Sequence, residues 1–164
     1  DISKKMLNLA KIKINSRKSI NFINDDFFNY EFKNKFDYVI SLGILAHIGN
    51  TDDFFKKIND FSKKGSKIVL QSSLEDFLTN KINKIFFSKR YFKKNDYRIN
   101  FIKERELKNY FKKYGFEIIF EQKYSLSIPI LDNYIPTLNY YIEKIFEKIF
   151  PNKGSEVIYI LKKK

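Results

Sequence analysis

Apolar residues recur at helical spacing in the first and second quarters of the chain. Ser3 is placed to cap a first helix that ends near Asn15. The second helix is expected to be capped by Thr51 or Asp52 and closed by Gly65. The apolar positions that define these two helices are Met6, Leu7, Ala10 and Ile14 in the first, and Phe54, Phe55, Ile58 and Phe61 in the second.

Two further helices are predicted in the second half. Residues 104–114 are amphipathic and are followed by Gly115, which supplies a stop signal. A strong apolar stripe also runs along residues 138–150, and such a stripe is typical of a core contact or a homodimer interface. Between the second and third helices, residues 74–103 are basic and aromatic, with two helical pieces and no strand pattern.

Strand patterns alternate with these helices. Residues 36–42 read as a strand buried on both faces, because Tyr38, Val39 and Ile40 are consecutive. The other expected strands cover residues 19–24, 67–71, 116–122 and 156–161. Strands and helices in this order predict an α/β fold with a mostly parallel sheet, whose ligand sites lie at the carboxyl ends of the strands.

Composition limits which functions fit this fold. A chain of 164 residues holds one core, so we expect a single domain over residues 1–164. It has no cysteine, no transmembrane stretch and no export signal, which fits a cytoplasmic location. The net charge of +13 comes from 28 lysines and four arginines, and arginine is the residue that phosphate and base recognition favour. This composition disfavours a nucleic-acid partner.

The order of these pieces resembles a class I S-adenosylmethionine-dependent methyltransferase. DISKKMLNLAK (1–11) is similar to the acidic end of the family's second strand and the helix after it, and NFINDDFF (21–28) is similar to its third strand and acidic turn. Residues 36–70 resemble the fourth strand, its helix and the fifth strand. ELKNYFKKYGFEIIF (106–120) and EVIYILKK (156–163) resemble the approach to the sixth strand and the antiparallel last strand. The resemblance implies a Rossmann-like fold that is incomplete at its N-terminus.

One feature of the family is missing from this resemblance. The glycine-rich loop after the first strand, which approaches the methionine part of the cofactor, has no counterpart here. We interpret the chain as an N-terminally truncated fragment in which the third and fourth strands lose their shared neighbour, exposing unpaired edges and apolar faces. By itself the fragment is expected to bind cofactor weakly or not at all, while its intact parent is an enzyme.

The resemblance assigns the adenosine end of S-adenosylmethionine to the first 28 residues. Asp1 takes the place of the acidic residue that accepts hydrogen bonds from the ribose hydroxyls, with Ile2 and Met6 beside it. Asp26, or alternatively Asp25, would accept from the adenine amine, and Phe27 would offer a flat apolar wall. The alternative roles are structural: Asp1 as a helix cap, and the two aspartates as an ordinary turn.

The end of the strand over residues 36–42 supplies the other expected site. Ser41, Leu42 and Gly43 lie where small residues let a ligand approach the backbone. His47, the only histidine, is the candidate catalytic residue, since it could accept a proton from the substrate. The alternative is that His47 packs under the loop or hydrogen-bonds a helix end. No metal site is expected.

These features predict methyl transfer to a small-molecule acceptor, most often at oxygen. SLGI at residues 41–44 does not resemble the Asn/Asp-Pro-Pro-aromatic motif of nucleic-acid amino-methyltransferases. The variable segments at 74–103 and 125–150 are expected to select the substrate. The basic and aromatic residues 81–94 are compatible with an anionic small molecule, with peripheral contact to a lipid surface or with a nucleic acid, and the alternative is a solvated lid. The alternatives are RNA methylation, which steeply salt-dependent RNA binding would favour, and a non-catalytic interaction module.

Overall fold

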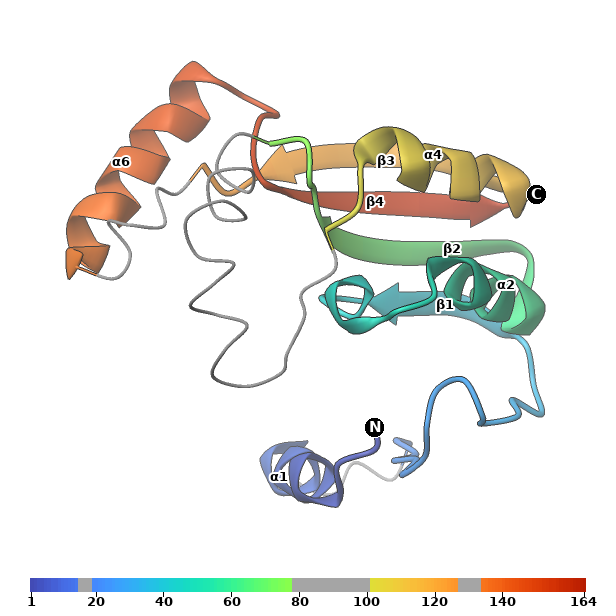
Figure 1. The fold of residues 1–164 in the computed structure, drawn as a ribbon. Helices are drawn as coiled ribbons and strands as arrows, with labels where there is room; N and C mark the ends of the chain where they lie inside the picture. The colour runs from blue at the N-terminus through green and yellow to red at the C-terminus, as the bar shows by residue number, and fades with distance from the viewer. Residues whose placement is uncertain (15–18, 78–100, 127–133) are drawn as a thin grey trace. The chain divides into compact units, whose positions relative to one another are not determined.

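The computed structural model describes residues 1–14, 19–77, 101–126 and 134–164. It divides into two units, residues 1–34 and residues 35–164 (Figure 1). The predicted helical pieces within residues 78–100 lie outside the described residues. Whether the chain forms a single domain stays a prediction.

The first unit contains helix α1 (Lys4–Ile14) and a loop. Ser3 caps the helix as predicted, because its Oγ accepts a hydrogen bond from the Met6 backbone N–H at 3.3 Å. The strand predicted over residues 19–24 is wrong, since this segment has no regular secondary structure. Among the described residues, its neighbours include the chain start, through the hydrogen bond from Asp1 N to Ile23 O, and Lys11, whose ammonium lies over the Phe22 ring, and no ladder of paired residues is present there.

The second unit is built on a four-stranded sheet with the order β1-β2-β4-β3. The strands are β1 (Phe36–Ser41), β2 (Ser62–Ser73), β3 (Phe116–Tyr124) and β4 (Glu156–Lys163). β1 and β2 are parallel, while β4 runs antiparallel to both β2 and β3. The expected α/β fold with an antiparallel last strand is therefore confirmed.

Helices α2 (Thr51–Phe61) and α4 (Glu104–Lys113) lie over one face of this sheet (Figure 1). Phe55 of α2 joins the two helices, because its ring stacks on Tyr110 at 5.4 Å and meets Phe111 edge-on at 5.5 Å. Phe111 then contacts Tyr159 of β4, with ring centroids 5.0 Å apart. All the predicted apolar residues of α2 are buried, so its helical spacing correctly identified the core.

Two details of the α2 termini differ from the prediction. The N-cap is Asn50, whose side chain accepts from Asp53 N at 3.2 Å, so neither Thr51 nor Asp52 is the cap. Gly65 does not end the helix: α2 stops at Phe61, and Ser62 already begins β2. The Ser62 hydroxyl donates to Ile58 O at 2.6 Å, which satisfies a carbonyl at the helix end. Gly115, in contrast, follows α4 as predicted with a φ of 70°.

The other sheet face is more open, and we call it the open face. In register across all four strands it carries an apolar row of Ile40, Val69, Ile160 and Phe120. Ile40 is 69% exposed and Phe120 is 44% exposed. The prediction that residues 36–42 are buried on both faces is wrong, because β1 is an edge strand. Within the described residues, β1 therefore leaves one edge of the sheet unpaired, with apolar side chains such as Ile40 exposed.

An ion-pair network fastens α4 to β3. Glu104 accepts from Lys108 at 2.7 Å and from Lys123 at 2.6 Å, and Lys108 also pairs with Glu121 at 2.9 Å. Partial burial by itself would raise the pKa of Glu104, but the hydrogen bonds from Lys108 and Lys123 outweigh it and lower that pKa to about 2. The network therefore stabilises the fold while Glu104 is ionised.

Glu104→Gln is expected to destabilise the protein at pH 7 by about 1–3 kcal/mol. A lowered folded-state pKa gives stability that is present above the unfolded value of 4.5 and is lost as the pH falls toward 2. Denaturant unfolding at pH 7, 4 and 3 should thus show that the difference in free energy of unfolding between wild type and variant shrinks as the pH falls. Glu106→Gln, on an exposed side chain of the same helix, is the control. A gap that stays constant with pH would contradict this role for Glu104.

Candidate functional site

In the first unit, the chain start lies beside residues 23 and 24. The Asp1 backbone nitrogen donates to Ile23 O at 2.9 Å, and the Asn24 side-chain amide donates to the carbonyl oxygens of Asp1 and Ile2, each at 2.9 Å. The acidic turn at residues 25 and 26 follows directly. Two hydrogen bonds to Asp1 and one to Ile2 therefore hold the chain start next to the segment that leads into that turn.

The carboxylates of this unit already make local hydrogen bonds. Asp1 Oδ1 accepts from Ser3 N at 2.8 Å, Asp25 Oδ1 accepts from Asp26 N at 2.8 Å, and Asp26 Oδ1 accepts from Phe28 N at 2.8 Å. The turn predicted for the two aspartates is thus confirmed. These bonds engage one oxygen of each carboxylate and orient the group, while a carboxylate can accept at both oxygens.

Aromatic rings gather after the acidic turn. The Phe27 ring lies 5.3 Å from Phe28 and 6.2 Å from Phe32, and the Tyr30 and Phe32 rings are 4.9 Å apart. Of the other predicted cofactor residues in this unit, Ile2 is 71% exposed and Met6 is 56% exposed. The unit therefore offers carboxylates and apolar surface within a short stretch of chain.

In the second unit, the other predicted residues follow β1. Ser41 is buried and its hydroxyl has no hydrogen-bond partner within the described residues. Leu42 is 57% exposed, and Gly43 has a φ of 71°, a backbone conformation that favours glycine. His47 ends the short helix η1 (Leu45–His47) and is exposed, which argues against packing beneath the loop.

Sequence analysis missed a polar group of residues at the same edge of the sheet. Ser73 at the end of β2, Glu156 at the start of β4 and Tyr124 at the end of β3 lie opposite one another in register. Glu156 accepts from the Ser73 hydroxyl at 2.7 Å and from the Gln71 amide at 2.9 Å. We call Gln71, Ser73, Tyr124 and Glu156 the edge cluster. Only the strand register brings these residues together, and no local sequence signal marks them.

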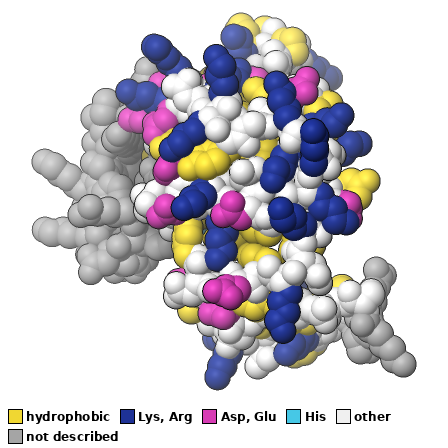
Figure 2. Space-filling view, turned by 90° about the vertical axis from the view of Figure 1, so that its right-hand side faces the viewer, with side chains coloured by type: hydrophobic (Ala, Val, Ile, Leu, Met, Phe, Trp, Pro, Cys, Tyr) yellow, Lys and Arg dark blue, Asp and Glu magenta, His cyan; other side chains and the backbone are white. Residues whose placement is uncertain are grey.

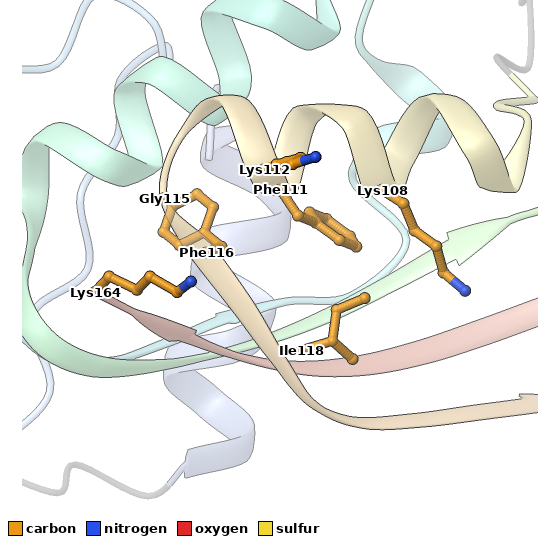
Figure 3. A pocket seen from close by; sticks show the side chains of 7 residues that line it. All are labelled: Lys108, Phe111, Lys112, Gly115, Phe116, Ile118 and Lys164. Atoms are coloured by element: carbon orange, nitrogen blue, oxygen red, sulfur yellow. The ribbon is translucent and has the colours of Figure 1, made fainter.

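A shallow pocket of about 320 Å³ lies elsewhere, between α4 and the beginning of β3 (Figure 3). Its lining comprises Lys108, Phe111, Lys112, Gly115, Phe116, Ile118 and Lys164. Phe116 is the first residue of β3, so this pocket is at the opposite end of that strand from the edge cluster. None of the predicted site residues lines it.

Basic side chains do not form one block on the face shown in Figure 2, where they alternate with acidic and apolar ones. Several lysines are engaged in ion pairs, such as Lys63 with Asp37 at 2.8 Å and Lys113 with Asp52 at 2.6 Å. Within the described ranges, no group of three or more His, Asp or Glu side chains is arranged to hold a metal ion. The helices described also include none with the length and hydrophobicity to cross a bilayer.

Comparisons with known proteins agree on one family. A family model described as a methyltransferase domain matches residues 1–121. Malonyl-[acyl-carrier protein] O-methyltransferase 2 of Ilyobacter polytropus is 32% identical over 76 residues, which is 46% of this chain and 29% of that protein. The chain thus matches less than a third of the length of this curated relative.

Solved structures show the same fold. A S-adenosylmethionine-dependent methyltransferase from Thermotoga maritima superposes with a TM-score of 0.68 at 16% identity, covering 100% of this chain and 71% of that one. Magnesium protoporphyrin IX methyltransferase from Synechocystis, solved with bound S-adenosylhomocysteine, gives a TM-score of 0.67 at 16% identity, covering 100% of this chain and 62% of that one. At these identities the likeness concerns the fold.

Proposed function

This chain belongs to the class I S-adenosylmethionine-dependent methyltransferases, and from that premise we propose that its protein transfers a methyl group from S-adenosylmethionine to a small molecule, at oxygen. The observation that carries the proposal is the hydrogen-bonded placement of Asp1 beside residues 23 and 24, at the entrance to the acidic turn. The Ilyobacter relative is an O-methyltransferase, which supports oxygen as the acceptor atom.

The residues present fit the adenosine end of this cofactor. Asp1 and Asp26 each have a carboxylate held by a local hydrogen bond, and Phe27 follows with an aromatic face. We assign the ribose hydroxyls to Asp1, with Ile2 and Met6 as apolar neighbours. We assign to Asp26 the hydrogen bond from the adenine amine, with Asp25 as the alternative acceptor. Charge-assisted hydrogen bonds of this kind are among the stronger ones in proteins.

In the second unit, we assign Ser41, Leu42 and Gly43 to cofactor contacts at the carboxyl end of β1. The unpartnered Ser41 hydroxyl is a buried polar group that a ligand could satisfy. When bound, S-adenosylmethionine supplies an electrophilic methyl group on a sulfonium, so the protein's work is mainly to align a nucleophile and exclude water. His47, exposed near this edge, is proposed to accept a proton from the acceptor.

Asp1→Asn tests the ribose assignment. Because the amide keeps the shape but loses the charge and one acceptor, the Kd for S-adenosylmethionine should rise about 10- to 100-fold. Titration calorimetry on the full protein measures this directly. Glu31→Gln, on an exposed carboxylate of the same unit, is the matched control and should leave the Kd unchanged. Equal affinities for Asp1→Asn and wild type would remove Asp1 from the site.

A methyl-transfer assay with labelled S-adenosylmethionine tests the reaction itself. Label entering small hydroxyl-bearing molecules supports the proposal, whereas label entering RNA would replace it with RNA methylation. A protein that binds no S-adenosylmethionine would be an interaction module that keeps the fold.

A further inference from the structure

Among the described residues, the half-buried Glu156 carboxylate accepts hydrogen bonds from neutral groups. Its Oε1 accepts from the Ser73 hydroxyl at 2.7 Å, and its Oε2 accepts from the Gln71 amide at 2.9 Å. Residues 1–14, 19–77, 101–126 and 134–164 contain no lysine or arginine paired with it, although the chain has 32 basic residues. Neutral donors orient the carboxylate but do not neutralise its negative charge.

This carboxylate can still accept further hydrogen bonds. Each of its oxygens has two lone-pair positions, and the two protein donors use one on each oxygen. Since both oxygens are already positioned, a ligand would not need to order the side chain on binding. The geometry is that of an acceptor prepared for a hydroxyl or an ammonium group.

Tyr124 completes the polar side of the cluster. It lies opposite Glu156 in the strand register and is half-buried. Burial and the negative charge of Glu156 raise the pKa of the Tyr124 phenol, while a hydrogen bond with Gln71 opposes that rise. The phenol is therefore kept protonated at neutral pH beside the carboxylate.

Apolar surface adjoins this polar group on the open face. Ile158 is two residues after Glu156 on the same strand and so faces the same way, and it pairs with Gln71. The row that contains Ile160 and Phe120 follows directly. Ile158 thus places an apolar side chain next to the polar group at Glu156.

The edge cluster also reaches the predicted site after β1. The Gln71 side-chain oxygen lies 3.7 Å from the position that a Cβ on Gly43 would take. Gln71 therefore extends from Glu156 to the backbone of Gly43, one of the residues assigned above to the cofactor. Both features belong to the second unit and to the carboxyl edge of its parallel strands.

We propose that the edge cluster is the subsite for the methyl acceptor, in which Glu156 binds a hydroxyl or ammonium group of a small molecule. The inference rests on the proposed methyl transfer, because it concerns the acceptor of that reaction. Glu156 binds the acceptor directly, and Gln71 and Ser73 act as positioning residues that hold its carboxylate.

Three probes with the same ring and different heads test this subsite: benzylamine, benzyl alcohol and benzoate. Two-dimensional NMR titrations of the full protein should show benzylamine binding most tightly, benzyl alcohol more weakly and benzoate not at all. Glu156→Gln should raise the Kd for benzylamine at least about tenfold. Glu117→Gln, an exposed carboxylate near the other end of β3, is the matched control and should not change it.

The outcomes separate this inference from the proposed function. If S-adenosylmethionine binds by calorimetry but Glu156→Gln leaves benzylamine binding unchanged, the subsite is wrong and methyl transfer stands. If benzylamine binding depends on Glu156 while S-adenosylmethionine does not bind, the proposed function fails and the cluster is a binding site of another kind. Thermal melting of Glu156→Gln shows whether that variant is folded. If it is not, Ser73→Ala gives a second measurement, and this variant is expected to weaken benzylamine binding less than Glu156→Gln would.

Discussion

Replacing Phe55 with alanine will lower the free energy of unfolding by about 3–5 kcal/mol. The side chain is 1% exposed and sits between α2 and α4, touching Phe54, Tyr110 and Phe111 through its ring. Its removal leaves a cavity at the contact of both helices, and Phe111 loses one of the rings that hold it over Tyr159. In a closely packed core the neighbouring side chains can relax into such a cavity only in part, so most of the lost packing energy is not regained.

Denaturant unfolding followed by circular dichroism measures this effect, with Ile145→Ala as the control. Ile145 lies on helix α6 (Pro136–Ile149) and is 55% exposed, so its truncation should cost less than about 1 kcal/mol. If both variants lose the same stability, the core does not lie between α2, α4 and the sheet.

Most helices could be predicted from sequence because their signals are local. The helix over residues 104–113 has apolar residues at helical spacing and a glycine after its last turn, and both signals belong to a dozen consecutive residues. The predicted cap of α2 is one or two residues too late because Asn50, Thr51 and Asp52 are all good capping types. Only the hydrogen bond to Asp53 distinguishes them.

Strands were harder to predict because their state depends on partners. Residues 19–24 have a suitable pattern but pair with no strand in the part of the chain that the structure describes, so they form none. The apolar run over residues 36–42 does form a strand, yet its burial was mispredicted. A pattern of consecutive apolar residues cannot reveal that a strand will lie at the edge of the sheet.

The site residues could be predicted only where they directly follow a single predicted strand or helix in the sequence. Ser41, Leu42 and Gly43 could be placed because they directly follow a strand. Glu156 could not, because Gln71 and Ser73 precede it by more than 80 residues and meet it only through the pairing of β2 with β4. The register of that pairing depends on the packing of the whole sheet face.

The edge cluster depends on a glycine that precedes it. A Cβ built on Gly154 would lie 1.8 Å from the carbonyl oxygen and 2.2 Å from the carbonyl carbon of Tyr124. Both atoms are backbone, so no side-chain rotation can relieve the clash. Ser155, the next residue, is fixed by hydrogen bonds from its N–H to Ser125 O at 2.9 Å and from Leu74 N to its own carbonyl at 2.8 Å. The chain therefore cannot shift without breaking these bonds.

Gly154→Ala is thus expected to destabilise the protein by about 3 kcal/mol or more. Because the clash pushes on Tyr124 where it pairs with Glu156, benzylamine binding at the cluster should weaken in the same variant. Gly49→Ala is the control, since a Cβ there would meet nothing within 4 Å. Denaturant unfolding and the benzylamine titration report the two effects. A Gly154→Ala protein as stable as Gly49→Ala would mean that β3 and β4 do not approach each other as closely at this edge.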